Sequence, residues 1–339
     1  MRRGLLSERR RRIRTGTVFI LLTLLLLWGI WLEINAGYRK ISPEEIWEIL
    51  RGKGAEGVRY TLINLRLPRV FTSLLVGVGL AVSGCVIQGV SGNHMAEPGI
   101  LGINAGAGLF VAGFLVFVPQ SPVSLTVLLP LLAFAGSIAV AALDYRLALT
   151  RQGISPGRLL LMGVAVSTAV SSVTTILMLR LPDSNHAFVQ KWLSGSIWGA
   201  DWKNVRLLFY CLLILGLFVF YKSRTLNVLS LSDQTAAGLG ADVPRQTVIL
   251  LGAAVAMSGL CCAVGGGLSF VGLVCPHMAR RLVGPNFRIL VPAAVLTGAV
   301  LMTYSDMISR TLLSPNEIPV GIVAAVIGAP YFLYLLIKT

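Results

Sequence analysis

The chain has 339 residues, of which 55% are hydrophobic and 13% are charged. A typical soluble domain is about 25% charged, so the polar residues are too few to cover a soluble protein, and the composition predicts an integral membrane protein. The net charge of +15 is ordinary for a membrane protein that keeps basic residues in cytoplasmic loops, and it does not indicate a nucleic-acid partner.

The apolar runs are long and continuous, which favours helices over a transmembrane β-barrel. A spanning helix needs about 20 apolar residues. Hydropathy alone does not decide between nine and ten helices, because three glycines at 265–267 interrupt the apolar stretch 247–275. The expected segments in chain order are 17–36, 70–91, 99–118, 123–143, 158–179, 205–221, 247–265, 270–283, 289–305 and 319–337.

The distribution of charge favours ten helices. With ten helices and the N-terminus inside, Lys and Arg concentrate in the inner segments and acidic residues in the outer ones, whereas nine helices erase this bias. We therefore expect an all-α polytopic membrane protein of about ten transmembrane helices, with both termini cytoplasmic. It forms one transmembrane domain over 1–339 that begins with a basic cytoplasmic segment, 1–16.

The N-terminus also resembles a signal peptide, because a basic region precedes an apolar core. Trp28 and Trp31 lie in that core and no clear cleavage site follows, so we expect a retained first helix.

Two extramembrane stretches are long enough to do more than connect helices. Residues 37–68 lie outside and contain Ser42-Pro43-Glu44-Glu45, a good helix start because Ser caps and Pro suits the first turn. Residues 222–246 lie inside and contain Ser232-Asp233-Gln234, which predicts a short helix that ends at Gly238.

Several kinds of chemistry are missing from the sequence. There is no phosphate-binding G-x-x-x-x-G-K-[ST] motif, no metal-ligand spacing and no Ser/His/Asp pattern, so we expect neither a catalytic site nor a metal site. The expected spans hold no Asp, Glu, Lys or His at mid-membrane depth. Proton-coupled carriers usually keep such groups there, so uphill transport by this chain would take its energy from a partner. The five cysteines lie in apolar runs, where small core residues are expected: Cys85, Cys211, Cys261, Cys262 and Cys275.

Small residues recur at i, i+4 spacing on several expected helices, which lets helix backbones approach closely. We expect tight intramolecular packing, with a subunit interface or a pore wall as alternatives. The stripes are Gly77, Ala81 and Cys85; Gly102 and Gly106; and Gly321, Ala325 and Ala329.

Basic residues cluster at the expected outer face. Arg66 and Arg69 precede the second span, and Arg310 follows the ninth. Two interpretations stay open: these arginines anchor helix ends, or they form a docking surface for acidic residues, because Arg offers forked donors to carboxylates.

Several short motifs of the chain are distinctive. In chain order they are Arg66-Leu67-Pro68-Arg69; Gly77-x-Gly79-Leu80-Ala81-x-Ser83-Gly84 with Gln88; Glu97-Pro98-Gly99-Ile100-Leu101-Gly102-Ile103-x-Ala105-Gly106-Ala107; Phe270-Val271-Gly272-Leu273-Val274-Cys275-Pro276-His277-Met278-Ala279-Arg280; Asp306-x-x-x-Arg310; Glu317-Ile318-Pro319-Val320-Gly321; and Gly328-Ala329-Pro330. Over roughly residues 60–339, these motifs resemble one known family, the iron-siderophore and vitamin B12 ABC importer permeases.

The resemblance implies a permease subunit of an ATP-driven importer in the bacterial cytoplasmic membrane. Such a subunit pairs with a second permease subunit, identical or paralogous, and with two cytoplasmic ATPases that hold ATP and Mg²⁺. An extracytoplasmic solute-binding protein delivers the substrate, here a ferric siderophore. The chain itself would bind no cofactor and catalyse no reaction. Cobalamin or haem is an alternative cargo for the same class of transporter. A self-contained secondary carrier or an intramembrane enzyme would be a different class. The missing coupling charges argue against the carrier, and the missing catalytic groups argue against the enzyme.

The resemblance also implies functional residues. Arg66, Arg69 and Arg310 would receive acidic residues of the binding protein. Segment 222–246 would couple to the ATPases, through Leu231, Ser232, Ala236, Leu239 and Gly240, although the family usually has Gly where Ser232 stands. The cytoplasmic gate would include Asn93, Met95 and Pro156, although His94 replaces the family's usual Pro.

Overall fold

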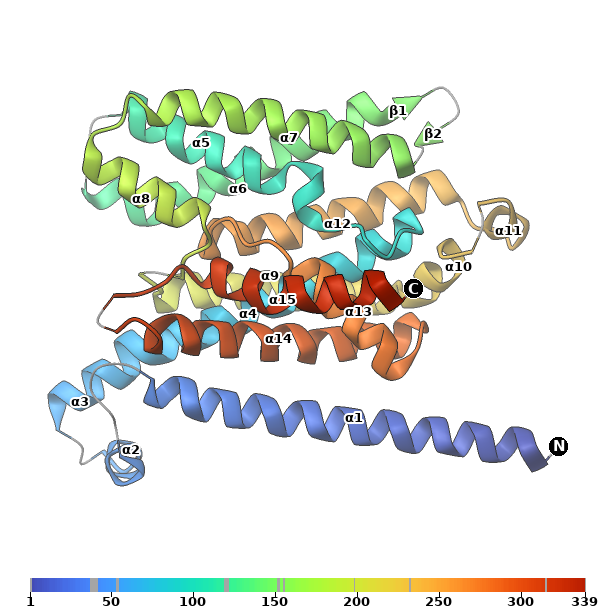
Figure 1. Cartoon of the computed structure of the whole chain (residues 1–339), viewed down its shortest axis with the longest axis horizontal. Coiled ribbons are helices and arrows are strands. Elements are labelled where there is room, and N and C mark those ends of the chain that lie inside the picture. The colour runs from blue at the N-terminus through green and yellow to red at the C-terminus, as the bar shows by residue number, and fades with distance from the viewer. Residues whose placement is uncertain are drawn as a thin grey trace.

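The computed structural model describes residues 2–36, 42–52, 55–118, 122–150, 153–154, 156–197, 199–231, 233–314 and 316–338, and it is an all-α bundle (Figure 1). Besides one antiparallel pair of two-residue strands, β1 (Leu149–Thr150) and β2 (Gly153–Ile154), every element is helical. The helices are α1 (Arg2–Asn35), α2 (Pro43–Leu50), α3 (Glu56–Tyr60), the π-helical η1 (Thr61–Arg66), α4 (Leu67–Ser91), the 3₁₀ helix η2 (Pro98–Leu101), α5 (Ile103–Phe117), α6 (Pro122–Ala148), α7 (Pro156–Met178), α8 (Asp183–Leu193), α9 (Trp202–Tyr221), α10 (Ser223–Leu229), α11 (Asp233–Gly238), α12 (Val243–Gly265), α13 (Val271–Val283), α14 (Phe287–Thr311) and α15 (Val320–Lys338).

Each of the ten expected apolar segments coincides with a helix. Within the described residues, seven helices are long and apolar enough to cross a membrane, and α5 and α15 are shorter apolar helices. The tenth, α13, has 13 residues and is short because the chain breaks at the expected glycines, with α12 ending at Gly265. The all-α membrane class is confirmed, and the count of ten crossings remains a prediction.

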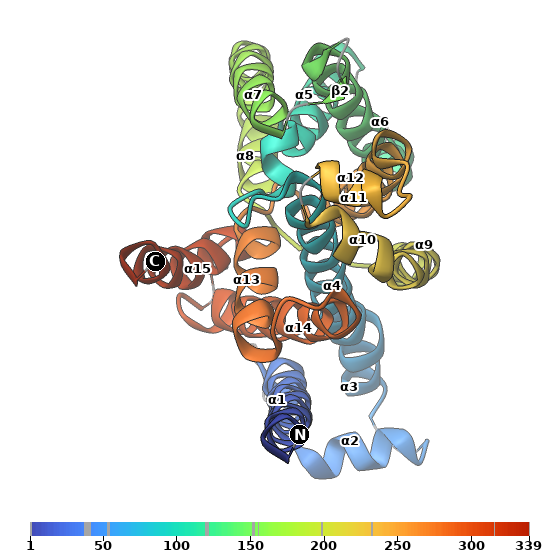
Figure 2. The same ribbon diagram turned by 90° about the vertical axis from the view of Figure 1, so that its right-hand side faces the viewer.

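The bundle has two distinct ends. Both termini, α10, α11 and the β1–β2 pair lie at one end, and α2, α3 and α8 lie at the other (Figure 1). We call these the inner end and the outer end, following the charge distribution of the sequence. Seen from the inner end, α5, α6, α7 and α8 form one group and α12 joins them to the helices around α4 (Figure 2).

Helix α4 is the centre of the second group and packs against α9, α12, α13 and α14. Its close contacts depend on glycine. A Cβ atom at Gly77 would overlap the backbone of Gly298 in α14, and one at Gly84 would overlap the backbone of Gly272 in α13. The small-residue stripe on α4 is therefore used for intramolecular packing.

Two short helices begin where the sequence predicts. The Ser42 hydroxyl accepts a hydrogen bond from the Glu45 amide at 3.1 Å, and the Glu45 carboxylate accepts one from the Ser42 amide at 2.8 Å. This capping box starts α2. Helix α11 ends at Gly238 as expected, while Ser232, its expected cap, lies outside the described residues.

The chain between α4 and α5 folds back into the bundle instead of staying at its inner end. Pro98 packs at Gly272 of α13, which in turn lies beside the Leu80 carbonyl in the middle of α4. At this level the Glu97 carboxylate accepts a hydrogen bond from the Phe270 amide at 3.2 Å. The sequence places Glu97 in the loop between two expected spans, outside either of them, and only the fold carries that loop into the bundle.

Candidate docking and coupling sites

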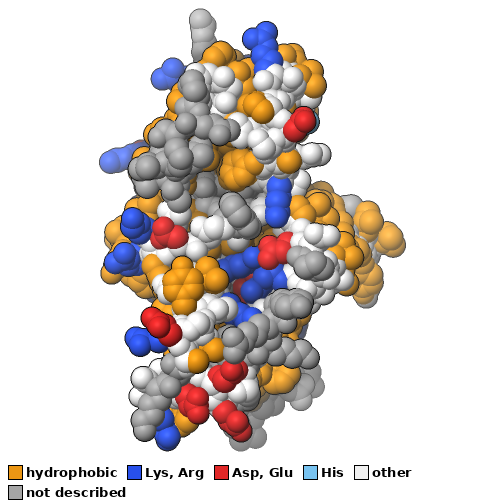
Figure 3. Space-filling model, turned by 90° about the vertical axis from the view of Figure 1, so that its left-hand side faces the viewer, with side chains coloured by type: hydrophobic (Ala, Val, Ile, Leu, Met, Phe, Trp, Pro, Cys, Tyr) orange, Lys and Arg blue, Asp and Glu red, His pale blue; other side chains and the backbone are white. Residues whose placement is uncertain are grey.

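The outer end carries a charge network centred on Arg69, near the start of α4. The Nε atom of Arg69 donates to both carboxylate oxygens of Asp306 in α14, at 3.0 and 3.1 Å. Its Nη1 atom donates to both oxygens of Glu317, each at 3.0 Å. Asp306 also pairs with Arg310 one turn later, at 3.1 Å. Figure 3 shows basic and acidic side chains gathered in a hollow near the centre of this face.

Arg66 and Arg310 meet the end of α1 rather than open solvent. Arg66 donates to the Ile34 carbonyl at 2.6 Å, and Arg310 donates to the Glu33 carbonyl at 2.9 Å. These carbonyls belong to the last turn of α1, which contains no basic residue of its own. Terminal carbonyls of a helix lack intrahelical partners, and a positive charge there is favourable. The two arginines therefore cap α1.

The Glu33 side chain also connects the end of α1 to α4. It is fully buried and accepts a hydrogen bond from the Ser73 hydroxyl of α4 at 2.9 Å. The sequence interpretation of arginines that anchor helix ends thus fits Arg66 and Arg310, which are both buried. Their docking role stays a prediction. Arg69 and Glu317 form the part of the network nearest the surface, with side chains 13% and 32% exposed.

Sequence reasoning missed the acidic half of this network. In the sequence, Asp306 and Glu317 stand out only as parts of family motifs, and Glu33 belongs to none of these motifs. The i, i+4 spacing of Asp306 and Arg310 is the one local signal of a pair. The other partners lie 237 and 248 residues from Arg69 along the chain.

The inner segment between α9 and α12 presents two large apolar side chains to the outside. Leu231 is 49% exposed and Leu239 is 65% exposed. Ala236, by contrast, is fully buried, so it faces this chain rather than a partner. Gly240 has a φ of +83°, a conformation that favours glycine, and its amide bonds to the Ala237 carbonyl at 2.9 Å just after α11.

The candidate gate residues Asn93 and Met95 lie in one tight turn after α4. The Asn93 side chain accepts a hydrogen bond from the Met95 amide at 2.9 Å, the local pattern that Asn favours in turns. Partial burial and the positive charge of Arg280 both lower the pKa of His94. Its imidazole is therefore neutral at neutral pH. Pro156 begins α7, toward the inner end.

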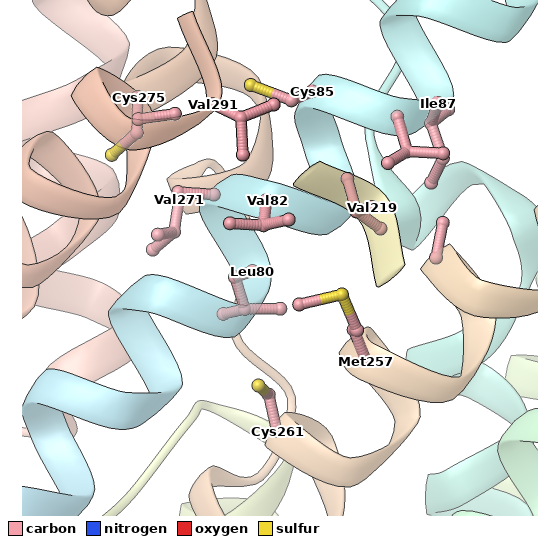
Figure 4. Close-up of a cluster of buried hydrophobic side chains, with 14 of the residues drawn as sticks. Leu80, Val82, Cys85, Ile87, Val219, Met257, Cys261, Val271, Cys275 and Val291 are labelled. Carbon is pink, nitrogen blue, oxygen red and sulfur yellow. The ribbon is translucent and has the colours of Figure 1, made fainter. Parts of the chain in front are cut away.

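Four of the five cysteines are core residues, and Cys211 is half-buried. All five are free thiols, and Cys85, Cys261, Cys262 and Cys275 are buried. Figure 4 shows Cys85, Cys261 and Cys275 among aliphatic side chains such as Leu80, together with Met257. Among the described residues, no group of three or more His, Cys, Asp or Glu side chains is arranged to hold a metal ion.

Comparison with known proteins assigns a family. Residues 24–338 match the model of the FecCD transport family. The chain is 42% identical to the iron(3+)-hydroxamate import system permease protein FhuG of Bacillus subtilis (strain 168), over 93% of this chain and 95% of that protein. It is also 42% identical to the Fe(3+) dicitrate transport system permease protein FecD of Escherichia coli (strain K12), over 82% of this chain and 86% of that protein.

A solved structure described as an inward-facing conformation of a metal-chelate type ABC transporter has the same fold. It superposes with a TM-score of 0.82 at 28% identity and covers 96% of this chain and 100% of that chain. Because the family model and these relatives match nearly the whole length, the chain belongs to the FecCD transport family.

Proposed function

We propose that this chain is the permease subunit of an ATP-driven importer that carries a ferric siderophore across the bacterial cytoplasmic membrane. The observation that carries the proposal is the nearly end-to-end match to import-system permeases, one of them for iron(3+)-hydroxamate. The sequence has no phosphate-binding loop of its own, so the energy would come from separate ATPases that bind ATP and Mg²⁺.

The complete transporter would contain four membrane-associated chains and one delivery protein. A second permease subunit, identical or paralogous, completes the pathway through the lipid bilayer, and one ATPase docks on the inner end of each permease. An extracytoplasmic binding protein docks on the outer end. The two ends of the bundle support this division, because exposed leucines lie at one and the arginine network at the other.

Copurification and uptake together test the proposal. The tagged chain, extracted from its native membrane in mild detergent, should bring down an ATPase and at most one further permease. Cells or vesicles with that complex should accumulate a radiolabelled ferric hydroxamate only with ATP and the binding protein. Uptake of ferric citrate, haem or cobalamin instead would reassign the cargo, and uptake without an ATPase would contradict the class.

Arg69 is the arginine on which docking is best tested. Charge reversal at Arg66 or Arg310 would also remove the cap of α1, so a loss of binding there would be ambiguous. Arg69→Gln should weaken association with the binding protein about tenfold, because a charge-assisted bond to a carboxylate is lost. Biolayer interferometry on the reconstituted transporter measures this, and unchanged affinity would remove Arg69 from the docking surface.

The exposed leucines of the inner segment provide the coupling test. Leu231→Asp with Leu239→Asp places charges on a surface that would pack against the ATPase, and uptake should fall more than tenfold while membrane insertion is retained. Ala236→Trp should also uncouple ATP hydrolysis from uptake, by displacing α11, because Ala236 is buried against its own chain. Lys203→Asp, on exposed surface at the outer end, is the matched control. Normal uptake in the leucine variant would contradict the coupling role.

A further inference from the structure

We propose that Glu317 holds the place on Arg69 that an acidic side chain of the binding protein takes when it docks. Docking then exchanges one carboxylate for another and releases the connection between α14 and α15. This inference rests on the proposed function, since it assigns the regulation of the same outer surface.

The geometry distinguishes a permanent partner of Arg69 from an exchangeable one. Asp306 is fully buried on α14 and is shared with Arg310. Glu317 lies outside any helix, three residues before α15, and its side chain is 32% exposed. Breaking a buried ion pair is strongly unfavourable, whereas an exposed pair contributes little net stability. An incoming carboxylate would therefore replace Glu317 and leave Asp306 in place.

The exchange keeps the charge around Arg69 constant. The guanidinium presents donors in a rigid fork. Here its Nε atom donates to Asp306 and its Nη1 atom donates to Glu317. When a partner's carboxylate accepts the hydrogen bond from Nη1, the arginine is never left unpaired in a poorly hydrated site. The Glu317 carboxylate meanwhile moves from a partly exposed position into water, so it is not left buried without a partner. Docking is thereby readily reversible, as repeated delivery requires.

The release of Glu317 reaches a specific part of the fold. Beside the ion pair, the segment that enters α15 is held by the Ile318 amide on the Ser309 carbonyl at 3.1 Å and by the Gly321 amide on the Gly195 carbonyl at 3.0 Å. A Cβ atom at Gly321 would overlap the Ser194 carbonyl, so α15 starts in close contact with the turn after α8. Loss of the Glu317 contact loosens this junction, which joins the two helix groups.

Affinity measurements on four forms of the reconstituted transporter test the exchange: wild type, Glu317→Gln, Arg69→Gln and the double variant, each with the binding protein of the same system. Removal of the competing carboxylate should tighten binding about tenfold in Glu317→Gln. The double variant should bind no more tightly than Arg69→Gln, because the gain requires the freed guanidinium. Glu56→Gln, an exposed outer acid, is the matched control and should leave affinity unchanged.

The outcomes separate the exchange from the docking proposal. If Arg69→Gln weakens binding but Glu317→Gln leaves it unchanged or weaker, docking on Arg69 stands and the exchange is wrong. If neither Arg69→Gln nor Glu317→Gln changes affinity, the docking surface itself is misassigned. Tighter binding in Glu317→Gln that survives in the double variant would also overturn the exchange.

A second measurement follows the junction between α14 and α15 by its labelling rate instead of by binding affinity. Asn316 is exposed beside Glu317, and Asn316→Cys introduces a thiol that a maleimide can label. Labelling should be several-fold faster when Glu317→Gln is combined with it, and addition of the binding protein to the Asn316→Cys transporter should accelerate labelling similarly. Equal rates in all three conditions would show that the junction does not loosen and would overturn the release step.

Discussion

Replacement of Asp306 by Asn is expected to cause the largest loss of stability of any single change in the outer network. The side chain keeps its shape but loses the charge that pairs Arg69 at 3.0 Å and Arg310 at 3.1 Å. Arg310 is 7% exposed and keeps only the more distant carboxylate of Glu33, at 3.9 Å, so most of its compensating charge is lost. Removing one partner of a buried ion pair typically costs about 3–5 kcal/mol. Thermal unfolding of the detergent-solubilised chain measures the effect.

Glu317→Gln is the matched comparison for Asp306→Asn, because both change a carboxylate partner of Arg69 to an amide. Glu317 is partly exposed, and such pairs are worth about 0–1 kcal/mol, so its variant should unfold within a few degrees of wild type. Raised salt should reduce that small difference, since it screens exposed pairs more than buried ones. Equal losses in the two variants would show that burial does not govern the strength of this network.

Replacement of Gly84 by Leu is expected to abolish a monodisperse, transport-competent protein. Gly84 of α4 lies so close to Gly272 of α13 that a single Cβ atom would overlap the neighbouring backbone. Backbone cannot rotate away as a flexible side chain does, so α4 and α13 must separate. Figure 4 shows what that separates: Leu80, Val82 and Cys85 on α4 pack beside Val271 and Cys275 on α13.

Overpacking in a filled core typically costs about 1–3 kcal/mol even where side chains can adjust, and a larger cost follows where two backbones touch. Gly216→Leu is the control, because a Cβ atom at Gly216 in α9 meets no neighbouring atom within 4 Å. Size-exclusion profiles in detergent and uptake in cells give the two readouts. A monodisperse Gly84→Leu protein with normal uptake would refute the packing argument.

Much of this fold can be predicted from the sequence, because the signals that determine it are local. The apolar runs give the helices, Ser42 and Glu45 give the start of α2, and the glycines at 265–267 give the break between α12 and α13. Each of these signals acts within a few residues, through hydrogen bonds of the helix ends or through the low helix propensity of glycine. Helix α8 was missed because its sequence is too polar to stand out by hydropathy.

The candidate sites could be predicted only in part, because the interaction partners of their residues come from distant parts of the chain. The sequence placed Arg66, Arg69 and Arg310 at one face, but it did not show that two of them cap α1. It marked Ala236 as a contact for a partner, whereas the fold buries that side chain. It left Glu97 in a loop, whereas the fold brings it to Phe270 in the bundle.

The amino-acid sequence by itself determined that this protein lives in a membrane, where its helices run and which motifs place it among importer permeases. Hydropathy, helix caps and glycine breaks are properties of contiguous residues, so they need no knowledge of neighbours. Only the tertiary structure decided which charges meet, because Arg69 finds Asp306 and Glu317 through the packing of α4 against α14. Each buried charge is stabilised by an oppositely charged side chain from another helix or loop, and the packing of the helices decides which side chain that is.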